Sequence, residues 1–120
     1  LGLAVCYDLR FPELFRRLLD AGAALFAVPS AFTVRPGRAH REVLVRARAV
    51  ENLAYVIAAA QGGYHLNGRE TYGDSMIVNP WGEVLDRLAR GSGVVLADID
   101  RRYFEHTRSR FPSIQHRKLR

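Results

Sequence analysis

The chain has 120 residues, 48% of them hydrophobic, with 18 basic and 12 acidic side chains and a formal net charge of +6. This length and composition predict one globular domain with a real core, and no apolar run approaches the ~20 residues that a membrane-spanning helix requires. The positive charge does not indicate a nucleic-acid partner, because arginines and acids are interleaved and only residues 116–120 form a basic run.

The first elements in chain order predict two parallel strands joined by a helix. Residues Leu1–Val5 form a continuous small-apolar run, which is typical of a strand buried on both faces. Pro12 fits the first turn of a helix, and Gly22 ends it. Residues 23–28 predict a second buried strand, so the crossover between the two strands is expected to be right-handed.

A loop at residues 31–38 is expected to lead into the longest helix, within residues 39–55. The expected apolar stripe of this helix comprises Val43, Leu44, Ala47, Val50 and Leu53. The spacing predicts ion pairs between Glu42 and Arg46 and between Arg48 and Glu51. Glu51 is therefore expected in a structural hydrogen-bond network with Arg48 and Asn52 rather than as a catalytic base.

The second half of the chain predicts antiparallel strands. The expected order is a strand at 55–60, a polar loop at 62–70, a hairpin at 72–88 that turns at 79–82, a strand at 94–99 and a helix at 101–111. Parallel crossovers and hairpins together predict an α/β fold with mixed sheets.

Cys6 is the only cysteine, which rules out an internal disulfide and suits a reducing compartment, so a cytoplasmic protein is expected. It lies between a strand and a helix, so its thiol can project at the carboxyl end of a parallel sheet, where open α/β folds build ligand sites. A nearby helix start and backbone N–H groups favour a thiolate and a developing oxyanion. A small buried core cysteine is the alternative that position alone leaves open.

Two other motifs are weaker candidates for chemistry. Gly73-Asp74-Ser75 has the look of a serine-hydrolase motif, but it enters a hairpin and lacks the sharp exposed elbow that a nucleophile needs. The four histidines are too dispersed for a recognisable metal site, so neither a metal nor a cofactor is expected.

Five ordered segments resemble the carbon–nitrogen hydrolase (nitrilase) superfamily. They are CYDLRFPEL at 6–14, PSAF at 29–32, RARAVENLAYVIAAAQ at 46–61, YGDSMIVNPWGEVL at 72–85 and QHR at 115–117. The first segment is similar to the nucleophile motif of that superfamily. The resemblance implies part of its four-layer αββα sandwich, with residues 1–120 as the C-terminal part of a single hydrolase domain whose N-terminal part lies upstream.

The resemblance implies Cys6 as the catalytic nucleophile, with a glutamate base and a lysine supplied from upstream of residue 1. It implies three substrate-binding positions: the Tyr7 backbone N–H for the oxyanion, Arg10 for a substrate carboxylate, and Phe32 as a pocket wall. A salt bridge from Arg10 to Asp8 or Glu13 is an equally open interpretation. No metal or cofactor is implied.

The implied reaction is hydrolysis of a small carboxylate-bearing amide through a cysteine thioester, with release of ammonia. The segments most resemble amidases acting on deaminated glutathione, and ω-amidases acting on α-ketoglutaramate-type substrates are the close alternative. An acyltransferase of the same superfamily and a catalytically incomplete binding or assembly protein also stay open. Three residues depart from the usual pattern: Arg41 replaces tryptophan, Asp74 replaces histidine and Asn79 replaces aspartate.

The resemblance also implies a homodimer and a small amide as the substrate. Neither a nucleic-acid partner nor a membrane partner is expected. Without the upstream half, the strand at Leu1–Val5 is expected to leave an exposed edge and apolar surface. The 120 residues alone are therefore expected to be marginally stable and catalytically inactive.

Overall fold

The computed structural model describes residues 1–119. The helices are α1 (Pro12–Asp20), α2 (Val34–Pro36), α3 (Glu42–Asn52) and α4 (Arg101–Arg110), with 3₁₀ turns η1 (Cys6–Arg10) and η3 (Ser113–His116) and a π-helical turn η2 (Gly37–Arg41). The strands are β1 (Gly2–Leu3), β2 (Leu25–Ala27), β3 (Tyr55–Ala58), β4 (Gly62–Tyr64), β5 (Glu70–Tyr72), β6 (Ser75–Val78) and β7 (Val84–Leu88). None of the helices in this described part is long and apolar enough to cross a membrane.

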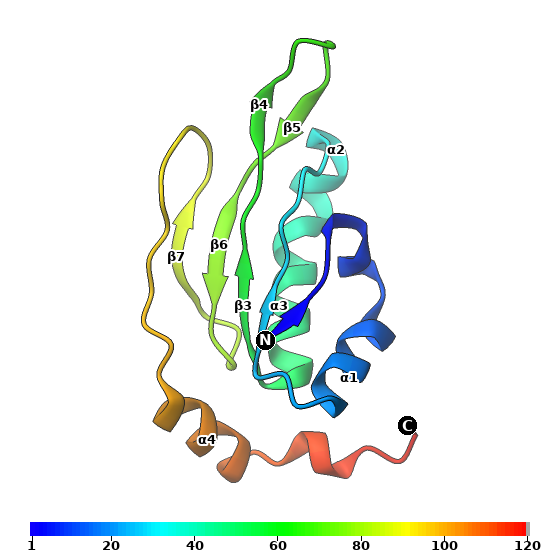
Figure 1. The fold of residues 1–120 in the computed structure, drawn as a ribbon, viewed down its shortest axis with the longest axis vertical. Coiled ribbons are helices and arrows are strands. Elements are labelled where there is room, and N and C mark those ends of the chain that lie inside the picture. Colours follow the sequence, from blue (N-terminus) through cyan, green and yellow to red (C-terminus); the bar gives the residue numbers. More distant parts are fainter. Residues whose placement is uncertain (120) are drawn as a thin grey trace.

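Five strands form one mixed sheet in the order β1-β2-β3-β6-β7 (Figure 1). The first three are parallel, and β6 and β7 continue the sheet as an antiparallel hairpin. The α/β class, the mixed sheet and the parallel strand–helix–strand unit are thus confirmed. Both strands of this unit are shorter than expected, because β1 has two residues and β2 has three.

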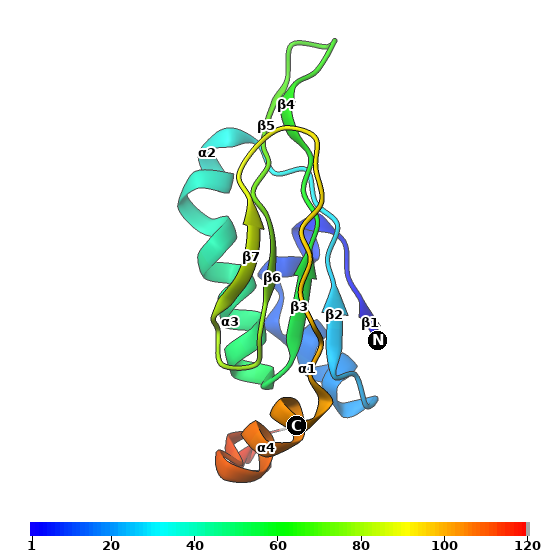
Figure 2. The same ribbon diagram turned by 90° about the vertical axis from the view of Figure 1, so that its left-hand side faces the viewer.

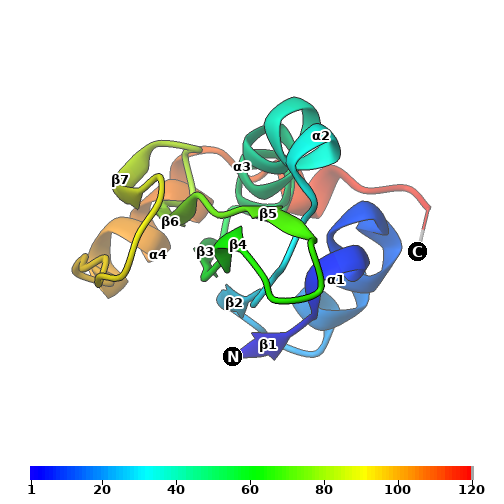
Figure 3. The ribbon, with the colours of Figure 1, turned by 90° about the horizontal axis from the view of Figure 1, so that it is seen from above.

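Helices α1 and α3 cover one face of this sheet (Figures 2 and 3). The core lies between them and the sheet, where the rings of Phe15 and Phe26 meet edge to face with centroids 5.2 Å apart. Both rings are fully buried, and each such side chain contributes about 1.5–3 kcal/mol of transfer free energy. The cross-sheet row from Gly2 through Phe26 and Val56 to Val78 faces this core.

The opposite face of the sheet is largely uncovered at the β1 edge. Side chains alternate along a strand, so Leu3 points away from the helices, together with its neighbours of the same parity. Leu1, Leu3 and Val5 are 74%, 68% and 61% exposed. This agrees with the expected exposed edge and apolar surface beside the first strand.

The strand expected at residues 94–99 is wrong. This segment is extended and crosses the open face on the β6–β7 side, but it joins no strand ladder. Its hydrogen bonds go to side chains: the Leu96 N–H donates to Asp86 Oδ2 at 2.7 Å, and the Tyr55 hydroxyl contacts the backbone of Asp100. Val94 and Leu96 remain more than three-quarters exposed, so the apolar run at residues 94–97 did not indicate strand pairing here.

The polar loop expected at 62–70 instead contains a two-stranded ribbon, β4 with β5, at the end of the molecule nearest α2 (Figure 1). Part of the loop expected at 31–38 is helical, because α2 and η2 precede α3 there. By contrast, the β6–β7 hairpin turns at 79–82 as expected. Gly82 adopts φ +87 there, and a Cβ at this position would lie 2.6 Å from Val50.

The apolar stripe expected for the helix within residues 39–55 is only partly confirmed: Leu53 is buried and Leu44 packs against the core, but the two valines of the stripe do not. Val43 and Val50 are 67% and 47% exposed, whereas Val45 and Ala49 are buried against the core. The buried face of α3 also carries polar residues, Arg48 and Asn52, so a periodicity based on apolar residues alone misses part of the buried face.

Candidate functional site

Cys6 lies on a strained turn between β1 and η1. Its φ is +48, a left-handed conformation that non-glycine residues rarely adopt and that costs about 1–3 kcal/mol. The Cys6 N–H donates to Pro29 O at 2.8 Å, which ties the turn to the end of β2. Asp8 closes the turn from the other side, because its carboxylate accepts the Val5 N–H at 2.8 Å and its own N–H donates to Val5 O. Such retained strain is typical of functional positions.

Two cavities meet at Cys6, where the parallel strands end. The larger one, about 500 Å³, is lined by Val5, Cys6, Pro29, Ser30, Ala31, Ala59, Ala60, Gln61 and Ser75. The smaller one, about 190 Å³, is lined by Cys6, Tyr7, Arg10, Ala31, Phe32, Thr33, Pro36 and Arg69. The thiol is only partly buried. It therefore lies between a mainly apolar hollow and a hollow with two guanidinium groups.

All three residues expected to bind substrate line the smaller cavity with Cys6. The Arg10 guanidinium carbon lies 5.4 Å from the ring centroids of both Tyr7 and Phe32, and Arg10 Nη1 is 3.3 Å from His40 Nδ1. Within the described residues, Arg10 makes no ion pair with Asp8 or Glu13. Cation–π contacts of this kind orient a guanidinium while leaving its N–H donors available to a ligand.

Tyr7 also occupies a position suited to oxyanion binding. It is the second residue of η1, where backbone N–H groups have no acceptor within the helical turn. The flanking amides of Cys6 and Asp8 are already committed to backbone carbonyls. The Tyr7 side chain is exposed and packs against Phe11.

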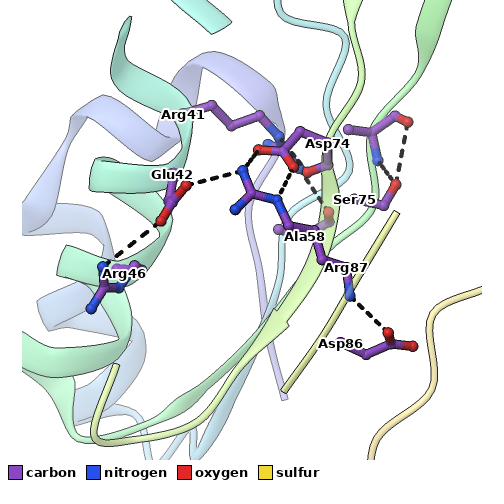
Figure 4. Close-up of polar contacts among 9 residues, drawn as sticks. Arg41, Glu42, Arg46, Ala58, Asp74, Ser75, Asp86 and Arg87 are labelled. Carbon is purple, nitrogen blue, oxygen red and sulfur yellow. Dashed lines mark hydrogen bonds and ion pairs between the residues drawn. The ribbon is translucent and has the colours of Figure 1, made fainter. Parts of the chain in front are cut away.

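Arg41 is a fully buried cation whose guanidinium carbon lies 5.8 Å from the ring centroid of Phe32, a wall of the smaller cavity, and Figure 4 shows its polar contacts. Its Nη2 donates to Ala58 O at 2.7 Å and its Nε donates to Asp74 O at 3.1 Å, while Nη1 has no partner among the described residues. Burial lowers the pKa of Arg41, and the charges of Asp74 and Cys6 oppose that shift. Two positions that depart from the superfamily pattern, Arg41 and Asp74, are thus in direct contact.

The Asp74 carboxylate is neutralised by Arg87, whereas Arg41 binds the backbone carbonyl of Asp74 (Figure 4). Arg87 Nη2 donates to Asp74 Oδ2 at 2.9 Å and also lies 3.0 Å from Glu42 Oε2. The bond to Asp74 raises the pKa of Arg87. Asp74 is therefore part of a structural charge network, and it adopts φ +71 within it.

The network expected around Glu51 is confirmed. Arg48 Nη1 lies 2.8 Å from Glu51 Oε1, and Asn52 Nδ2 donates to Arg48 O at 2.9 Å. Arg48 Nε also donates to Leu9 O, which connects α3 to the turn after Cys6. The expected pair of Glu42 and Arg46 is present as well, at 3.8 Å.

Four further residues line the two cavities, and sequence reasoning did not identify them as such: Ser30, Gln61, Arg69 and Ser75. Arg69 comes from the turn between β4 and β5, and its Nη2 donates to Ala31 O at 3.0 Å. Ser75 accepts the Ala60 N–H at the edge of the larger cavity. An Asn-Gly pair before Arg69 indicates a turn, but only the long-range packing of that turn brings Arg69 to Cys6.

Neither cavity is lined by a glutamate, an aspartate or a lysine of the described chain. Lys118, the only lysine, lies beyond η3 and reaches neither one. The general base and the ammonium group that the sequence resemblance implies are therefore not supplied by residues 1–119.

The chain is similar to several known proteins over nearly its whole length. It is 52% identical over 118 residues to a deaminated glutathione amidase of Bos taurus, covering 98% of this chain and 36% of that protein. The NitFhit structure of C. elegans matches 98% of this chain and 28% of that one, with 47% identity and a TM-score of 0.94. Nit3 of Saccharomyces cerevisiae, a nitrilase-superfamily member, matches with 33% identity, a TM-score of 0.90 and coverage of 98% and 44%.

The chain thus spans little more than a third of the curated relative that it matches. The family model for carbon–nitrogen hydrolases matches residues 1–109, which include the strained cysteine turn and the lining of both cavities. The chain belongs to the carbon–nitrogen hydrolase family.

Proposed function

We propose that this chain carries the nucleophile of an amidase that hydrolyses a small carboxylate-bearing amide through a thioester on Cys6. The observation that carries the proposal is the turn itself: a strained cysteine, held by Pro29 and Asp8, opens onto two cavities at the carboxyl edge of parallel strands. The name of the related deaminated glutathione amidase of Bos taurus supports the same reaction class.

The proposed reaction proceeds in two steps. The Cys6 thiolate attacks the amide carbonyl, and the Tyr7 N–H stabilises the resulting oxyanion. The C–N bond then breaks, the leaving nitrogen takes a proton, and water hydrolyses the thioester to regenerate the thiol. A glutamate base and a lysine from chain preceding Leu1 are proposed to move the protons and stabilise the tetrahedral intermediate.

Arg10 supports a substrate that carries a carboxylate. Its guanidinium is held against Tyr7 and Phe32 beside Cys6, and planar N–H donors bind carboxylates in a bidentate manner. Deaminated glutathione is the substrate class proposed first, after the name of the relative from Bos taurus. An ω-amidase acting on α-ketoglutaramate-type substrates is the alternative within the same mechanism.

The test uses the full-length gene product with Cys6→Ser and Cys6→Ala variants. We expect both variants to lose at least about 10³-fold in kcat, because neither hydroxyl nor methyl replaces an activated thiolate. Rapid-quench mass spectrometry of the wild type should detect an acyl adduct on the peptide containing Cys6. Amidase activity retained by a correctly folded Cys6→Ala variant would disprove the assignment of Cys6 as the nucleophile. A folded full-length wild type without any amidase turnover would favour the binding or assembly role instead.

The isolated 120-residue chain provides a second arm of this test. We expect no amidase turnover from it, because neither cavity contains a general base from the described residues. Homodimer formation and a cytoplasmic location stay predictions from the sequence. Sedimentation of the full-length product would test the first of them.

A further inference from the structure

The smaller cavity beside Cys6 is cationic. Arg10 and Arg69 both line it, and its other lining residues are Cys6, Tyr7, Ala31, Phe32, Thr33 and Pro36, without a carboxylate among them. The two arginines reach it from separate elements, one from η1 and the other from the turn between β4 and β5. At neutral pH this hollow therefore presents two positive charges next to the nucleophile.

The Arg69 side chain is held in place while most of its donors stay available. Its Nη2 donates to Ala31 O at 3.0 Å, which places the guanidinium against the lining of the cavity. Its backbone is fixed as well, because its N–H donates to Asn67 Oδ1 and its carbonyl accepts the His65 N–H. A guanidinium has five N–H donors, so this single side-chain bond leaves four for a ligand.

Two other arginines near this cavity differ from Arg69, because each is paired with an acidic side chain. Arg87 is paired with Asp74, and Arg90 is paired with Glu70, the residue that directly follows Arg69. In the described part of the chain no acidic side chain pairs with Arg69 or with Arg10. The fold thus pairs Glu70 with a more distant arginine and leaves the two at the cysteine cavity without counter-ions.

We propose that Arg69 is a specificity-determining residue that binds a second substrate carboxylate, in addition to the one that Arg10 holds. The preferred substrate is then a small amide that carries two carboxylates, both within reach of this one cavity. The two guanidinium groups lie in one small cavity, so a compact dianion neutralises both, whereas a monoanion leaves one of them uncompensated. This inference rests on the proposed function, because it takes Cys6 as the reacting atom.

The experiment measures ligand binding separately from turnover. Full-length protein with Cys6→Ala is titrated calorimetrically with N-(carboxymethyl)succinamate, a dianion, and with N-methylsuccinamate, a monoanion of similar shape. Arg69→Gln is expected to weaken binding of the dianion about 10-fold or more and to change binding of the monoanion less than about 2-fold. Arg10→Gln is expected to weaken binding of both ligands, and Arg69→Lys should retain part of the preference for the dianion.

Arg35→Gln is the matched control, because Arg35 is an exposed arginine on α2 that lines neither cavity. It should leave both affinities unchanged. Equal weakening of both ligands by Arg69→Gln would mean that Arg69 only positions its loop, and it would overturn the proposal. So would unchanged binding of both ligands, or a parent protein that binds neither. If the ligands bind as expected but the wild type hydrolyses neither one, the proposed function fails while the assignment of Arg69 stands.

Discussion

The two faces of the five-stranded sheet differ sharply. On the face toward α1 and α3, Phe26, Val56 and Val78 are fully buried and form a continuous core. On the other face, Leu3 is 68% exposed at the β1 edge, and the segment 89–100 runs on the β6–β7 side (Figure 1) and contacts β3 through Tyr55 and Asp100. The same strands thus carry a completed core on one side and a largely uncovered apolar surface on the other.

Cys6 lies where these two regions meet. Its turn is anchored through Pro29 to β2 and, through Arg48 and Leu9, to α3 on the covered face. The larger cavity beside it is lined by Val5, which has the same strand parity as the exposed Leu3. The covered face therefore positions the turn that carries Cys6, whereas the larger cavity beside its thiol lies next to the exposed side of β1.

The largest expected loss of stability comes from a substitution on the covered face. Phe26→Ala in the full-length product should lower the free energy of unfolding by about 3–5 kcal/mol, because it leaves a cavity against Phe15. Phe111→Ala is the matched control, since that ring is 51% exposed and packs edge to face only on Trp81. Its cost should be about 1 kcal/mol. Urea unfolding measures both, and equal losses would contradict the distinction between core and surface.

Substitution of Arg41 tests the polar part of the covered face, and we expect an intermediate loss of the free energy of unfolding. Arg41→Met keeps an apolar stem but removes the donors to Ala58 O and Asp74 O, so we expect a loss of about 1–3 kcal/mol. Arg41→Lys should lose less, because one ammonium group can still reach one of these carbonyls. An Arg41→Met variant as stable as the wild type would show that the buried guanidinium contributes nothing net, as some buried charges do.

The smallest effect is expected on the open face. In the isolated 120-residue chain, Leu3→Ser should change the free energy of unfolding by less than about 0.5 kcal/mol, because the side chain is already exposed. In the full-length product the same substitution should cost about 2 kcal/mol if an upstream half of the domain covers this face, as the sequence resemblance implies. Identical effects in the two proteins would show that the face stays open.

Most of the local structure near Cys6 could be predicted from sequence. Pro12 at a helix start, Gly22 at its end and the short apolar runs on either side specify a strand–helix–strand unit that the structure contains. The hairpin turn could be predicted equally well, because it is a local structure: Asn79 Oδ1 accepts two backbone N–H groups, from Trp81 and Glu83. Both depend on interactions between residues a few positions apart.

The errors have a common cause. Residues 94–97 form a short apolar run that is typical of a strand. Strand pairing also requires a neighbouring backbone edge, and this segment is held by the side chains of Asp86 and Tyr55 instead. On α3, Arg48 is more buried than Val43, because its guanidinium finds acceptors on η1 that lie 39 positions away in sequence. Hydrophobicity patterns do not include such distant partners.

By itself, then, the sequence determined the cysteine turn, the α/β class and the family to which the chain belongs, since these follow from short motifs and local backbone preferences. Only the tertiary structure decided that Arg41 is buried beside Phe32 and that Arg69 lines a cavity with Cys6 and Arg10. Arg69 is 63 positions from Cys6, a separation that the numbering gives directly. Contacts across such distances are set by strand order and helix packing, because no local preference specifies where a distant turn will fold back.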